Sequence, residues 1–520
     1  MFKIKIKFFI YARFFIILMP YSRSADGKLS RKNMEIPDVF EKIRSENVKF
    51  IDLQFTDVPG KLHHVTVPTH TINDSSFSVG VPKLDGSSIR GFTGINESDM
   101  LLRPDPNSFV IVPWSDPDAK YARLLCSVYW GQGVSTHKGE ALEKDPRGTA
   151  QKAEAYLKEN GFDVSYWGPE LEFFVFDSVT WNTSTPAAGQ SYCIKSNEAA
   201  WKPGGYKEFN EQEKRIHHPI RHKEGYFPVT PQDTLMDFRN DAVLTMEDSF
   251  GIVTDAHHHE VATAGQCEIN MLYDSLVNQA DSAQSFKYVV KNIAHQYNQV
   301  ATFMPKPLAG DNGSGMHVHQ SLWKGKNNEF YDENDAHAQI SQTARYYIGG
   351  ILAHTQALAC IVAPSTNSYK RLVPGFEAPV YIAWSRSNRS ANVRIPVNLT
   401  SQPAAKRIEF RCPDPSANPY LAFAAMLCAG IDGIKNKIDC GDPTDENIYL
   451  LSSERRRQMG IKELPKNLGE ATDALENDSA FLDPVFDKSL LEFMIEFARD
   501  QHNEIISRTH PHEFELYFDV

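Results

Sequence analysis

The sequence predicts an α+β fold with at least two domains. Its 520 residues exceed what a single hydrophobic core usually organises, so more than one domain is expected. Short strand-like runs separated by Pro and Gly fill residues 48–132, whereas long helical patterns alternate with strands in the rest of the chain. A polar connector, Gly131–Lys144, lies between the two regions. We therefore predict an N-terminal domain over residues 34–140 and a larger domain over residues 141–520.

The composition narrows the classes of function. Hydrophobic residues make up 41% and charged residues 23% of the chain, which is typical of a globular protein. The formal net charge of −12 argues against a nucleic-acid partner, because nucleic-acid binding requires a basic surface. The seven cysteines include no Cys-x-x-Cys pair, and they indicate the reduced thiols of a cytoplasmic protein.

The first 33 residues form an extension of uncertain status. Met1–Lys7 is basic, and Phe8–Met19 is largely apolar but interrupted by Arg13, as in a signal-like or membrane-touching segment. The apolar run is too short and too interrupted to span a bilayer. Because an ordinary sequence begins at Met34, we interpret residues 1–33 as an extension or a misplaced start, outside the fold prediction.

The small domain is predicted to begin with a helix and a hairpin. Ile36–Glu46 has the apolar spacing of a short amphipathic helix. Val48–Phe55 and Lys61–Pro68 have the composition of strands, and Asp57–Gly60 between them has that of a turn.

The large domain begins with a helix that carries signals at both ends. Asp145-Pro146 supplies an N-cap and a proline in the first turn, and Asn160-Gly161 ends the helix. The strand Trp167–Asp177 follows, and then a long polar insertion, 177–226, without clear periodicity. Further helices are predicted at Ser282–Thr302, Gln339–Val362, Asn418–Lys437 and Asp483–Arg508.

Two glutamates in the strand Trp167–Asp177 require an explanation. Glu170 and Glu172 are two residues apart in an apolar, aromatic run, so their side chains share one face of the strand. Carboxylates about 4 Å apart repel by roughly 4 kcal/mol at an effective dielectric constant near 20, and burial adds a desolvation cost. Either the strand is half exposed and both glutamates face solvent, or the two share a divalent cation.

Four further stretches place polar side chains on one face of a strand. Individually, a Glu-Arg alternation is typical of an ion pair on a solvent-exposed face, and consecutive histidines are typical of a polar surface. Together, such strands would line one cavity while their apolar faces pack against helices. Carboxylates dominate the set, which suits Mg²⁺ or Mn²⁺ better than zinc. The residues are His258 and Glu260, then Glu268, then His317, His319 and Ser321, and finally Arg407, Glu409 and Arg411.

Clustered arginines point to phosphate chemistry. Guanidinium groups bind phosphate and carboxylate in bidentate geometry, and divalent cations beside them are typical of phosphoryl transfer. The chain has no Gly-x4-Gly-Lys-Ser/Thr motif, so a P-loop is not expected. Gly310–Gly315 would let the backbone approach a ligand, although a tight loop also explains it. The arginines are Arg371, Arg389, Arg394, Arg407 and Arg411.

With these motifs in place, the chain resembles type I glutamine synthetase from about Val48 to Val520, and in particular its bacterial, adenylylation-regulated subgroup. The resemblance rests on long motifs in the same order. They are Asp85–Ser88, Gly168–Phe174, His257–Gln266, Lys306-Pro307 with Gly310–His319, Asn367–Gly375, Asn388–Ala391 and Arg407–Arg411.

The resemblance implies a fold, a reaction and an assembly. The fold would be a small β-grasp-like N-terminal domain and a larger catalytic domain whose curved antiparallel sheet is flanked by helices. The reaction would be ATP-dependent ligation of ammonia to L-glutamate through γ-glutamyl phosphate, which yields L-glutamine for nitrogen metabolism. The assembly would be a dodecamer of two six-subunit rings with active sites between neighbouring subunits.

The resemblance also implies roles for individual residues. One divalent cation would be held by Glu172, Glu260 and Glu268, and a second by Glu170, His317 and Glu409. Glutamate would be bound by Asn312, Gly313, Arg371, Glu377 and Arg411. The residues near ATP and its phosphates would be Asp255, His319, Ser321, Arg389, Arg394 and Arg407.

The resemblance also gives roles to Asp85 and Tyr449, and a second role to Glu377. Asp85, delivered from a neighbouring subunit, would bind ammonium and take its proton. Glu377, on a flap after Pro374-Gly375, would shield the acyl phosphate from water, and the chemistry of such an intermediate requires a closing loop. Tyr449 matches the tyrosine that an adenylyltransferase modifies in regulated bacterial members.

The chain departs from the family pattern near three functional positions. Leu450 and Ser452-Ser453 replace the Asp and Pro that follow the modified tyrosine, which weakens the expectation of adenylylation. A lysine five residues before Glu409 is Ala404 here, with Lys406 nearby. A glutamate near the nucleotide is Asp255. The last two changes are expected to affect ATP affinity but remove no metal ligand.

Two other functions stay open. A γ-glutamyl-amine ligase would use the same metal and arginine motifs, although Asp85 favours ammonia, because deprotonating a small cation calls for a carboxylate at the entrance. A non-catalytic structural relative would keep the assembly alone, and the intact set of metal-binding side chains argues against it.

Overall fold

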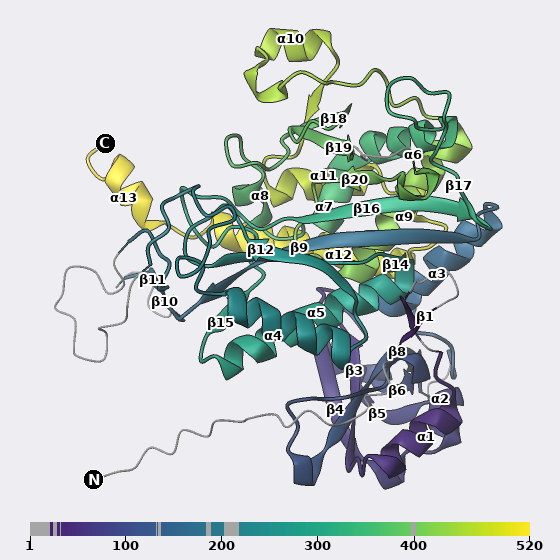
Figure 1. The fold of residues 1–520 in the computed structure, drawn as a ribbon. Coiled ribbons are helices and arrows are strands. Elements are labelled where there is room, and N and C mark those ends of the chain that lie inside the picture. The colour runs from purple at the N-terminus through teal and green to yellow at the C-terminus, as the bar shows by residue number, and fades with distance from the viewer. Residues whose placement is uncertain are drawn as a thin grey trace, which may run out of the picture.

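The computed structural model describes residues 21–23, 29–31, 33–131, 133, 137–183, 189–201, 218–396 and 402–520 (Figure 1). The basic and apolar stretches within residues 1–19 lie outside the described residues. Within the described ranges, no helix combines the length and the apolar character needed to cross a membrane. All seven cysteines are unpaired, as the sequence predicts. A short antiparallel pair, β1 (Tyr21–Arg23) and β2 (Leu29–Arg31), precedes the small domain.

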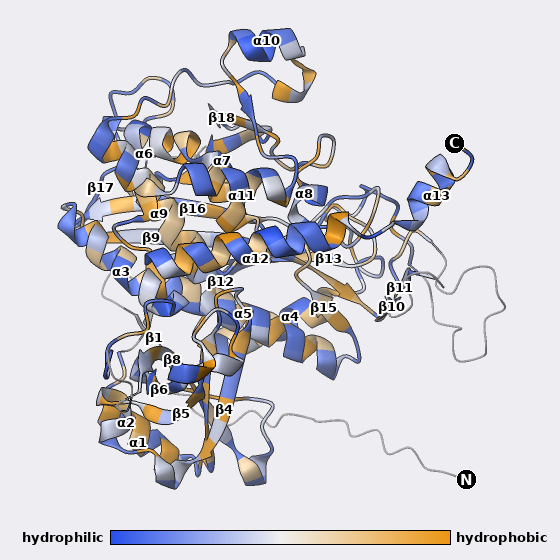
Figure 2. Ribbon diagram, turned by 180° about the vertical axis from the view of Figure 1, so that it is seen from behind, coloured by the Kyte–Doolittle hydropathy of each residue, from blue (hydrophilic) through white to orange (hydrophobic). Residues whose placement is uncertain are grey.

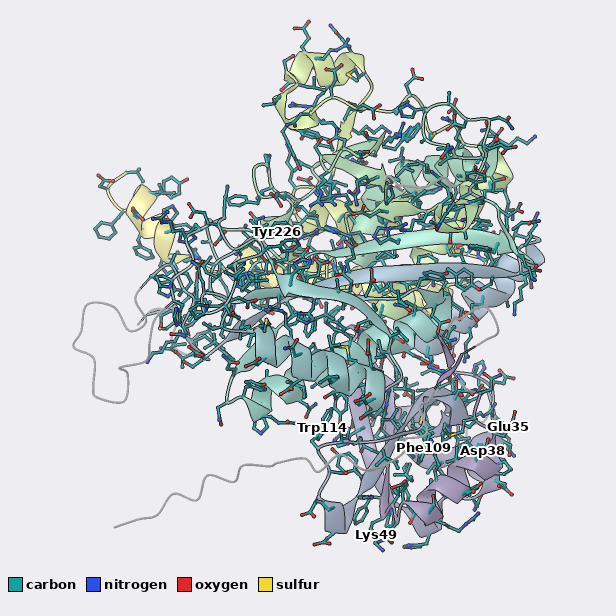
Figure 3. All side chains as sticks on the ribbon, in the orientation of Figure 1. Glu35, Asp38, Lys49, Phe109, Trp114 and Tyr226 are labelled. Carbon is teal, nitrogen blue, oxygen red and sulfur yellow. The ribbon has the colours of Figure 1, made fainter. Side chains whose placement is uncertain are left out.

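The predicted N-terminal helix is confirmed as α1 (Ile36–Ser45). It begins with a capping box in which the backbone N–H of Glu35 donates to the Asp38 carboxylate over 2.9 Å, and Figure 3 shows both residues at this helix. Val39 and Ile43, one turn apart, are buried in the hydrophobic core.

Six strands form the sheet of the small domain, in the order β4-β3-β8-β6-β5 with β7 paired to β8. β3 and β8 are parallel, and the other pairs are antiparallel. The predicted hairpin is confirmed: β3 and β4 enclose a turn in which Gly60 has a φ of 98°, which favours glycine. The helix α2 (Asp74–Ser78) lies between β4 and β5. The strands are β3 (Phe50–Thr56), β4 (Leu62–Pro68), β5 (Val81–Asp85), β6 (Asp99–Pro104), β7 (Val110–Ile111) and β8 (Tyr121–Trp130).

Eleven strands form the large sheet, in which the long β9 (Val164–Phe176) pairs with β13, β14, β15 and β16 (Figure 1). The main order is β12-β13-β9-β16-β20-β19-β18-β21, and among the described strand pairs of this sheet only β18 and β19 are parallel. The strands predicted around the polar motifs are therefore confirmed. The remaining strands are β12 (Thr254–His259), β13 (Gln266–Met271), β14 (Asp274–Ser275), β15 (Val300–Thr302), β16 (Met316–Lys324), β17 (Asn327–Asn328), β18 (Tyr381–Arg386), β19 (Ala391–Ile395), β20 (Ile408–Phe410) and β21 (Lys462–Glu463).

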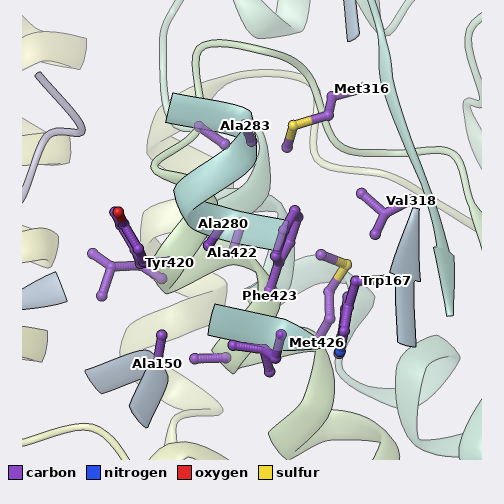
Figure 4. Close-up of a cluster of buried hydrophobic side chains, with 14 of the residues drawn as sticks. Ala150, Trp167, Ala280, Ala283, Met316, Val318, Tyr420, Ala422, Phe423 and Met426 are labelled. Carbon is purple, nitrogen blue, oxygen red and sulfur yellow. The ribbon is translucent and has the colours of Figure 1, made fainter. Parts of the chain in front are cut away.

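Helices pack against the apolar face of the large sheet. The ring of Trp167 in β9 stacks on Phe423 in the buried helix α9 (Pro419–Asn436), with centroids 5.3 Å apart, and Met316 and Val318 of β16 belong to the same cluster (Figure 4). The strand alternation thus turns the apolar side chains to the core and the polar motifs to the opposite face.

The other helices complete this layer and the edges of the sheet. Seen from behind, α12 crosses the helical layer and shows hydrophilic residues along much of its length (Figure 2). The helices are α3 (Pro146–Glu159), α4 (Met236–Asp248), α5 (Leu276–Gln296), α6 (Gln342–Ala353), α7 (Thr355–Val362), α8 (Ser368–Arg371), α10 (Ser453–Gln458), α11 (Leu468–Asn477), α12 (Lys488–Ile506) and α13 (Pro511–Tyr517).

Three helix predictions were wrong in their bounds. α12 begins at Lys488 and not at Asp483. α5 spans 276–296 and not 282–302, because residues 300–302 are extended and pair with β9. Residues 339–362 are not one helix: His354 lies between α6 and α7, where its ring contacts carboxylates of Asp432 and Asp478.

The polar insertion contains a hairpin that its lack of periodicity did not predict. β10 (Ser178–Asn182) and β11 (Ser191–Lys195) pair in antiparallel register. Residues 202–217 of the insertion lie outside the described part of the chain.

A buried arginine side chain joins the two domains through ion pairs. Arg147 of α3 donates to both oxygens of Asp281 in α5, at 3.0 and 2.9 Å, and to Asp105 of the small domain at 2.6 Å. Asp281 also accepts from the Tyr420 hydroxyl over 2.7 Å. Burial opposes the charge of Arg147, but Asp281 and Asp105 outweigh it and hold the pKa of Arg147 above its ordinary value.

Replacing Arg147 by Met is expected to lower the free energy of unfolding by about 3–5 kcal/mol, because the Asp281 carboxylate would remain buried without its partner. Urea unfolding of the purified protein measures the change. Arg499→Met is the matched control, since Arg499 pairs with Asp473 and Glu476 at the surface, where such pairs contribute at most about 1 kcal/mol. Equal losses in the two variants would contradict a special role for the buried pair.

Candidate active site

The polar face of the large sheet lines a cavity of about 210 Å³. Every carboxylate and histidine predicted to bind metal lies in its wall, as do four of the five clustered arginines. The side chain of Tyr226, which is labelled in Figure 3, also lines the cavity. The predicted residues that meet here are Glu170, Glu172, Glu260, Glu268, His317, Glu409, Asn312, Gly313, Arg371, Glu377, Arg389, Arg394 and Arg411.

Two groups in this wall have the composition of cation sites. In each group, one possible ligand atom from every residue lies within 4.8 Å of the others. The strand register creates them, because β9, β16 and β20 are adjacent in the sheet, as are β12 and β13. The groups are Glu170 with His317 and Glu409, and His258 with Glu260 and Glu268.

Glu172 lies beside the second group. It is opposite Glu268 in the sheet, but its Oε2 atom accepts hydrogen bonds from Gln266 Nε2 and from the backbone N–H of Gly315, each over 3.0 Å. His258, opposite Glu268 on its other side, completes the compact group. The resemblance placed Glu172 in this group and gave His258 no ligand role, but the register of the hairpin formed by β12 and β13 brings His258 opposite Glu268.

Burial raises the pKa values of the glutamates in and beside the second cation group, which are Glu172, Glu260 and Glu268. Burial and the charge of Glu260 raise the pKa of Glu172 to about 8, and burial raises the pKa of Glu260 to about 7. Burial and the charges of Glu170 and Glu172 hold the pKa of Glu268 well above its usual range. A divalent cation would supply the positive charge that this part of the cavity lacks.

Glu170 and Glu409 show the opposite shift, because histidine and arginine side chains surround them. Burial would raise both pKa values, but His319 and His317 hold the pKa of Glu170 well below its usual range, and Arg411 with His319 lowers the pKa of Glu409 to about 2. Burial and Arg411 lower the pKa of His317 to about 4, which leaves its ring neutral, as a metal ligand must be. His317 Nδ1 lies 3.4 Å from Glu170 and 3.8 Å from Glu409.

The donor set fits Mg²⁺ or Mn²⁺. Carboxylates outnumber imidazoles in the wall, and oxygen ligands are those that these hard cations prefer. The clustered carboxyl groups with raised pKa values and the neutral His317 ring are the features that a bound cation would use.

The arginines are fixed by backbone and carboxylate acceptors. The guanidinium of Arg371, which is buried, donates to backbone carbonyl oxygens of residues 411–413 over 3.0 to 3.2 Å. Arg411 donates to Glu409 over 2.9 Å, and Arg394 donates to the same carboxylate. The Glu-Arg alternation of β20 is therefore a buried network and not an ion pair on a solvent-exposed face.

The glycine-rich loop 310–315 brings the backbone close to the site. A Cβ atom at Gly315 would lie 2.6 Å from Nη2 of Arg371 and 3.0 Å from Nε2 of His317. The carboxylate of Asp311, which is fully buried, accepts hydrogen bonds from three backbone N–H groups and fastens the loop. Close approach to the site therefore requires glycine here, beyond the needs of a tight turn.

Residues 374–378, which we call the flap, cover the edge of the cavity. Glu377 has a φ of 58°, which is uncommon for a residue other than glycine. Side chains from three other segments hold the flap through its backbone carbonyl oxygens. Gly375 accepts from Lys223 over 2.9 Å, Glu377 from Arg411 over 3.3 Å, and Ala378 from the Tyr449 hydroxyl over 2.5 Å.

A second cavity of about 360 Å³ adjoins the first, and Glu170 and Asn270 line both. His319 connects them: its Nε2 lies 2.9 Å from Glu170, and its Nδ1 accepts from Arg407 over 3.2 Å. Ala404 and Lys406, at the departures from the family pattern, also line this cavity. The predicted ATP-binding residues in its wall are Asp255, His319, Ser321 and Arg407.

Asp85 lies in the small domain and is in the wall of neither cavity. Its exposed carboxylate accepts hydrogen bonds from the Ser87 hydroxyl over 2.7 Å and the Ser88 hydroxyl over 3.0 Å. These bonds hold the pKa of Asp85 below its ordinary value, so the group is ionised at neutral pH. Its predicted delivery to a neighbouring subunit stays a prediction.

Sequence reasoning missed other residues of the first cavity, among them Asn270 and Tyr226. Asn270 follows Glu268 by two residues in β13, and its Nδ2 donates to Glu268 over 2.7 Å. The alternation in this strand would have revealed it. Tyr226 comes from the end of the insertion, where the sequence carried no periodic signal.

Comparison with protein families covers both domains. The model described as the glutamine synthetase catalytic domain matches residues 143–517, and the glutamine synthetase β-grasp domain matches residues 47–131. Glutamine synthetase of Sulfolobus acidocaldarius is 51% identical over 484 residues, which cover 93% of this chain and 98% of that protein. A protein named 3-hydroxylaminophenol mutase from Cupriavidus pinatubonensis is 46% identical over 488 residues, covering 93% and 99%.

Comparison with solved structures agrees with these matches. The Plasmodium falciparum glutamine synthetase structure has a TM-score of 0.81 at 27% identity, covering 92% of this chain and 98% of that one. The predicted β-grasp domain and the curved, helix-flanked sheet are thereby confirmed. The chain belongs to the glutamine synthetase family of enzymes.

Proposed function

We propose that the protein ligates ammonia to L-glutamate at the expense of ATP, through γ-glutamyl phosphate, in the cytoplasm. The observation that carries this proposal is the pair of adjoining cavities joined at Glu170. One has buried arginines and clustered carboxylates for a charged substrate and cations, and the other has room for a nucleotide. Their junction is where a γ-phosphoryl group would meet the glutamate side chain.

The first cavity supplies the residues for cations and phosphate. Bound Mg²⁺ or Mn²⁺ would supply positive charge to the transferred phosphoryl group. Arg389 and Arg394 line the cavity and neutralise the remaining phosphate charge. The cation ligands are Glu172, Glu260 and Glu268 for one site, with His258 beside them, and Glu170, His317 and Glu409 for the other.

Glutamate and nucleotide occupy opposite sides of this junction. Arg371 and Arg411 bind the carboxylates of glutamate, with Asn312 and the backbone of Gly313. A γ-carboxylate oxygen attacks the γ-phosphorus of ATP, and ADP leaves. The nucleotide lies in the second cavity along Asp255, His319, Ser321 and Arg407.

Ammonia then replaces the phosphate. Asp85 of a neighbouring subunit in the proposed dodecamer binds ammonium and takes its proton, and ammonia attacks the acyl carbon as phosphate leaves. Glu377 and the rest of the flap keep water from the acyl phosphate. The ionised state of Asp85 supports this role.

Tyr449 is the proposed target of an adenylyltransferase. Its hydroxyl is the group that would be modified, and modification would break its hydrogen bond to Ala378 of the flap. Treatment with such an enzyme and ATP should add one adenylyl group by intact mass and lower activity. A Tyr449→Phe variant that is still modified would show that another residue is the target.

A γ-glutamyl-amine ligase is the second candidate. A relative named as a mutase is 46% identical, so similarity alone does not fix the reaction. Phosphate release from ATP with glutamate, Mg²⁺ and either ammonium or putrescine separates the candidates. We expect turnover with ammonium, strongly reduced in Asp85→Ala. Turnover with putrescine alone would overturn the proposal.

The affinity for Mn²⁺ is expected to fall as the pH decreases below about 8. Glu172 and Glu260, with pKa values of about 8 and about 7, must lose their protons before they coordinate a cation. Below its pKa, each displaced proton weakens binding by up to about tenfold per pH unit. Calorimetric titration from pH 9 to pH 6, in steps of about one unit, measures this, and Glu172→Gln should flatten the profile. A pH-independent affinity in the unmodified protein would contradict the prediction.

A further inference from the structure

The largest of the cavities described here lies away from the proposed active site. It has a volume of about 540 Å³, within the usual range of small-molecule sites, and is lined by β3, β4 and α5. Figure 1 shows α5 above these two strands, at the junction of the domains. Trp114 of the small domain, labelled at this junction in Figure 3, packs on Tyr288 of α5 with ring centroids 5.1 Å apart. The cavity is therefore bounded by both domains.

The α5 side of this cavity is polar. Gln284, Lys287, Tyr288 and Lys291 follow the spacing i, i+3, i+4 and i+7, so they lie on one face of the helix. A helix that packed directly on the small sheet would carry apolar residues at these positions. The helix instead turns two lysines toward a cavity.

The floor of the cavity holds a hydrogen-bonded carboxylate and an acceptor without a donor. Asp52 is buried and contacts three donors: Gln54 Nε2 at 2.9 Å, His64 Nδ1 at 2.5 Å and the Thr66 hydroxyl at 2.7 Å. Gln54 as a whole residue is 2% exposed, and its Oε1 atom has no hydrogen-bond donor among the described residues. A ligand with a hydroxyl or N–H group would satisfy it.

Three lysines bring positive charge to the cavity. Lys61 and Lys291 are exposed at its mouth, and Lys287 lies deeper, where it donates to the carbonyl oxygen of Ala417 over 3.1 Å. Among the described residues, no carboxylate lies within 4.0 Å of the ammonium group of any of the three. Burial and the charge of Lys291 lower the pKa of Lys287 to about 7, so an anion between them would relieve repulsion.

We propose that this cavity binds a small organic anion, namely a ring or similar apolar body that carries a phosphate or carboxylate group. The anionic group lies among the three lysines, which bind phosphate and carboxylate as point charges. The apolar body packs against the side chains that complete the wall. These are Phe50, Leu62, Tyr121 and Tyr288.

Calorimetric titration of the full-length protein tests the proposal, with MgADP present to occupy the nucleotide site. The probes are phenyl phosphate, benzoate, inorganic phosphate and phenol. We expect phenyl phosphate or benzoate to bind with a Kd of about 10–100 μM, and the stronger of the two identifies the anionic group. Inorganic phosphate and phenol should bind at least about tenfold more weakly, since each lacks one half of the recognised structure.

Variants at the cavity mouth locate the binding site. Lys61→Gln and Lys291→Gln change exposed side chains, so folding should be unaffected. Each should weaken binding by about tenfold, whereas the control Lys488→Gln on α12 should leave it unchanged. Absence of binding by both ring-bearing anions, unchanged affinity in the two cavity variants, or inorganic phosphate binding as tightly as phenyl phosphate would each overturn the proposal. Glutamine formation is assayed separately, so this result is independent of the proposed reaction.

Discussion

The Glu170→Gln variant is expected to form glutamine about 10³-fold more slowly than the unmodified protein. Glu170 lines both cavities, lies opposite His317 in the sheet, and contacts His319 over 2.9 Å. The substitution would replace a proposed carboxylate ligand of the cation with a neutral amide. Steady-state glutamine formation and Mn²⁺ titration measure the two consequences, and both should change.

Glu492→Gln is the matched control for this substitution. Glu492 lies on α12 and pairs with Lys488 over 3.5 Å at the surface, so its loss should leave activity unchanged. Near-normal turnover of Glu170→Gln, with normal Mn²⁺ affinity, would show that the junction of the cavities is not the reaction centre.

Lys223→Met is expected to uncouple ATP consumption from glutamine formation. Lys223 donates to Gly375 of the flap over 2.9 Å, and its ammonium lies 4.3 Å from the centroid of the Phe376 ring. Without this contact the flap opens more often and admits water to the acyl phosphate. The ratio of phosphate released to glutamine formed should rise well above one, and kcat/KM for ammonium should fall about tenfold or more.

Tyr449→Phe provides a graded comparison. It removes the hydrogen bond to Ala378 and keeps the ring, so the same uncoupling should occur to a smaller extent. A ratio of phosphate to glutamine that stays at one in both variants would contradict the role of these contacts in excluding water.

Much of the candidate site could be predicted from strand alternation alone. Glu170 and Glu172, His317 and His319, and Glu409 alternate with apolar residues, so their common face followed from the backbone geometry. The partners within each cation group could not be predicted this way. They depend on strand register, which brings together β9, β16 and β20 from distant parts of the sequence and places His258 opposite Glu268 in the hairpin formed by β12 and β13.

The helices show the same division between local and long-range information. The caps at Asp145 and Asn418 predicted α3 and α9, because their side chains accept hydrogen bonds from the first turn. The end of α5 was wrong because residues 300–302 pair with β9, and tertiary pairing outweighs the weak helical preference of this segment. The cavity between α5 and the strands β3 and β4 was not predicted either, since its walls come from different domains.

Isotope transfer tests the central claim most directly. Glutamate labelled with ¹⁸O in its γ-carboxylate is incubated with the protein, MgATP and ammonium, and the released phosphate is analysed by mass spectrometry. If the γ-carboxylate attacks ATP at the junction of the two cavities, one ¹⁸O atom should appear in phosphate for each glutamine formed. Unlabelled phosphate accompanied by glutamine would contradict the acyl phosphate route and the assignment of the two cavities.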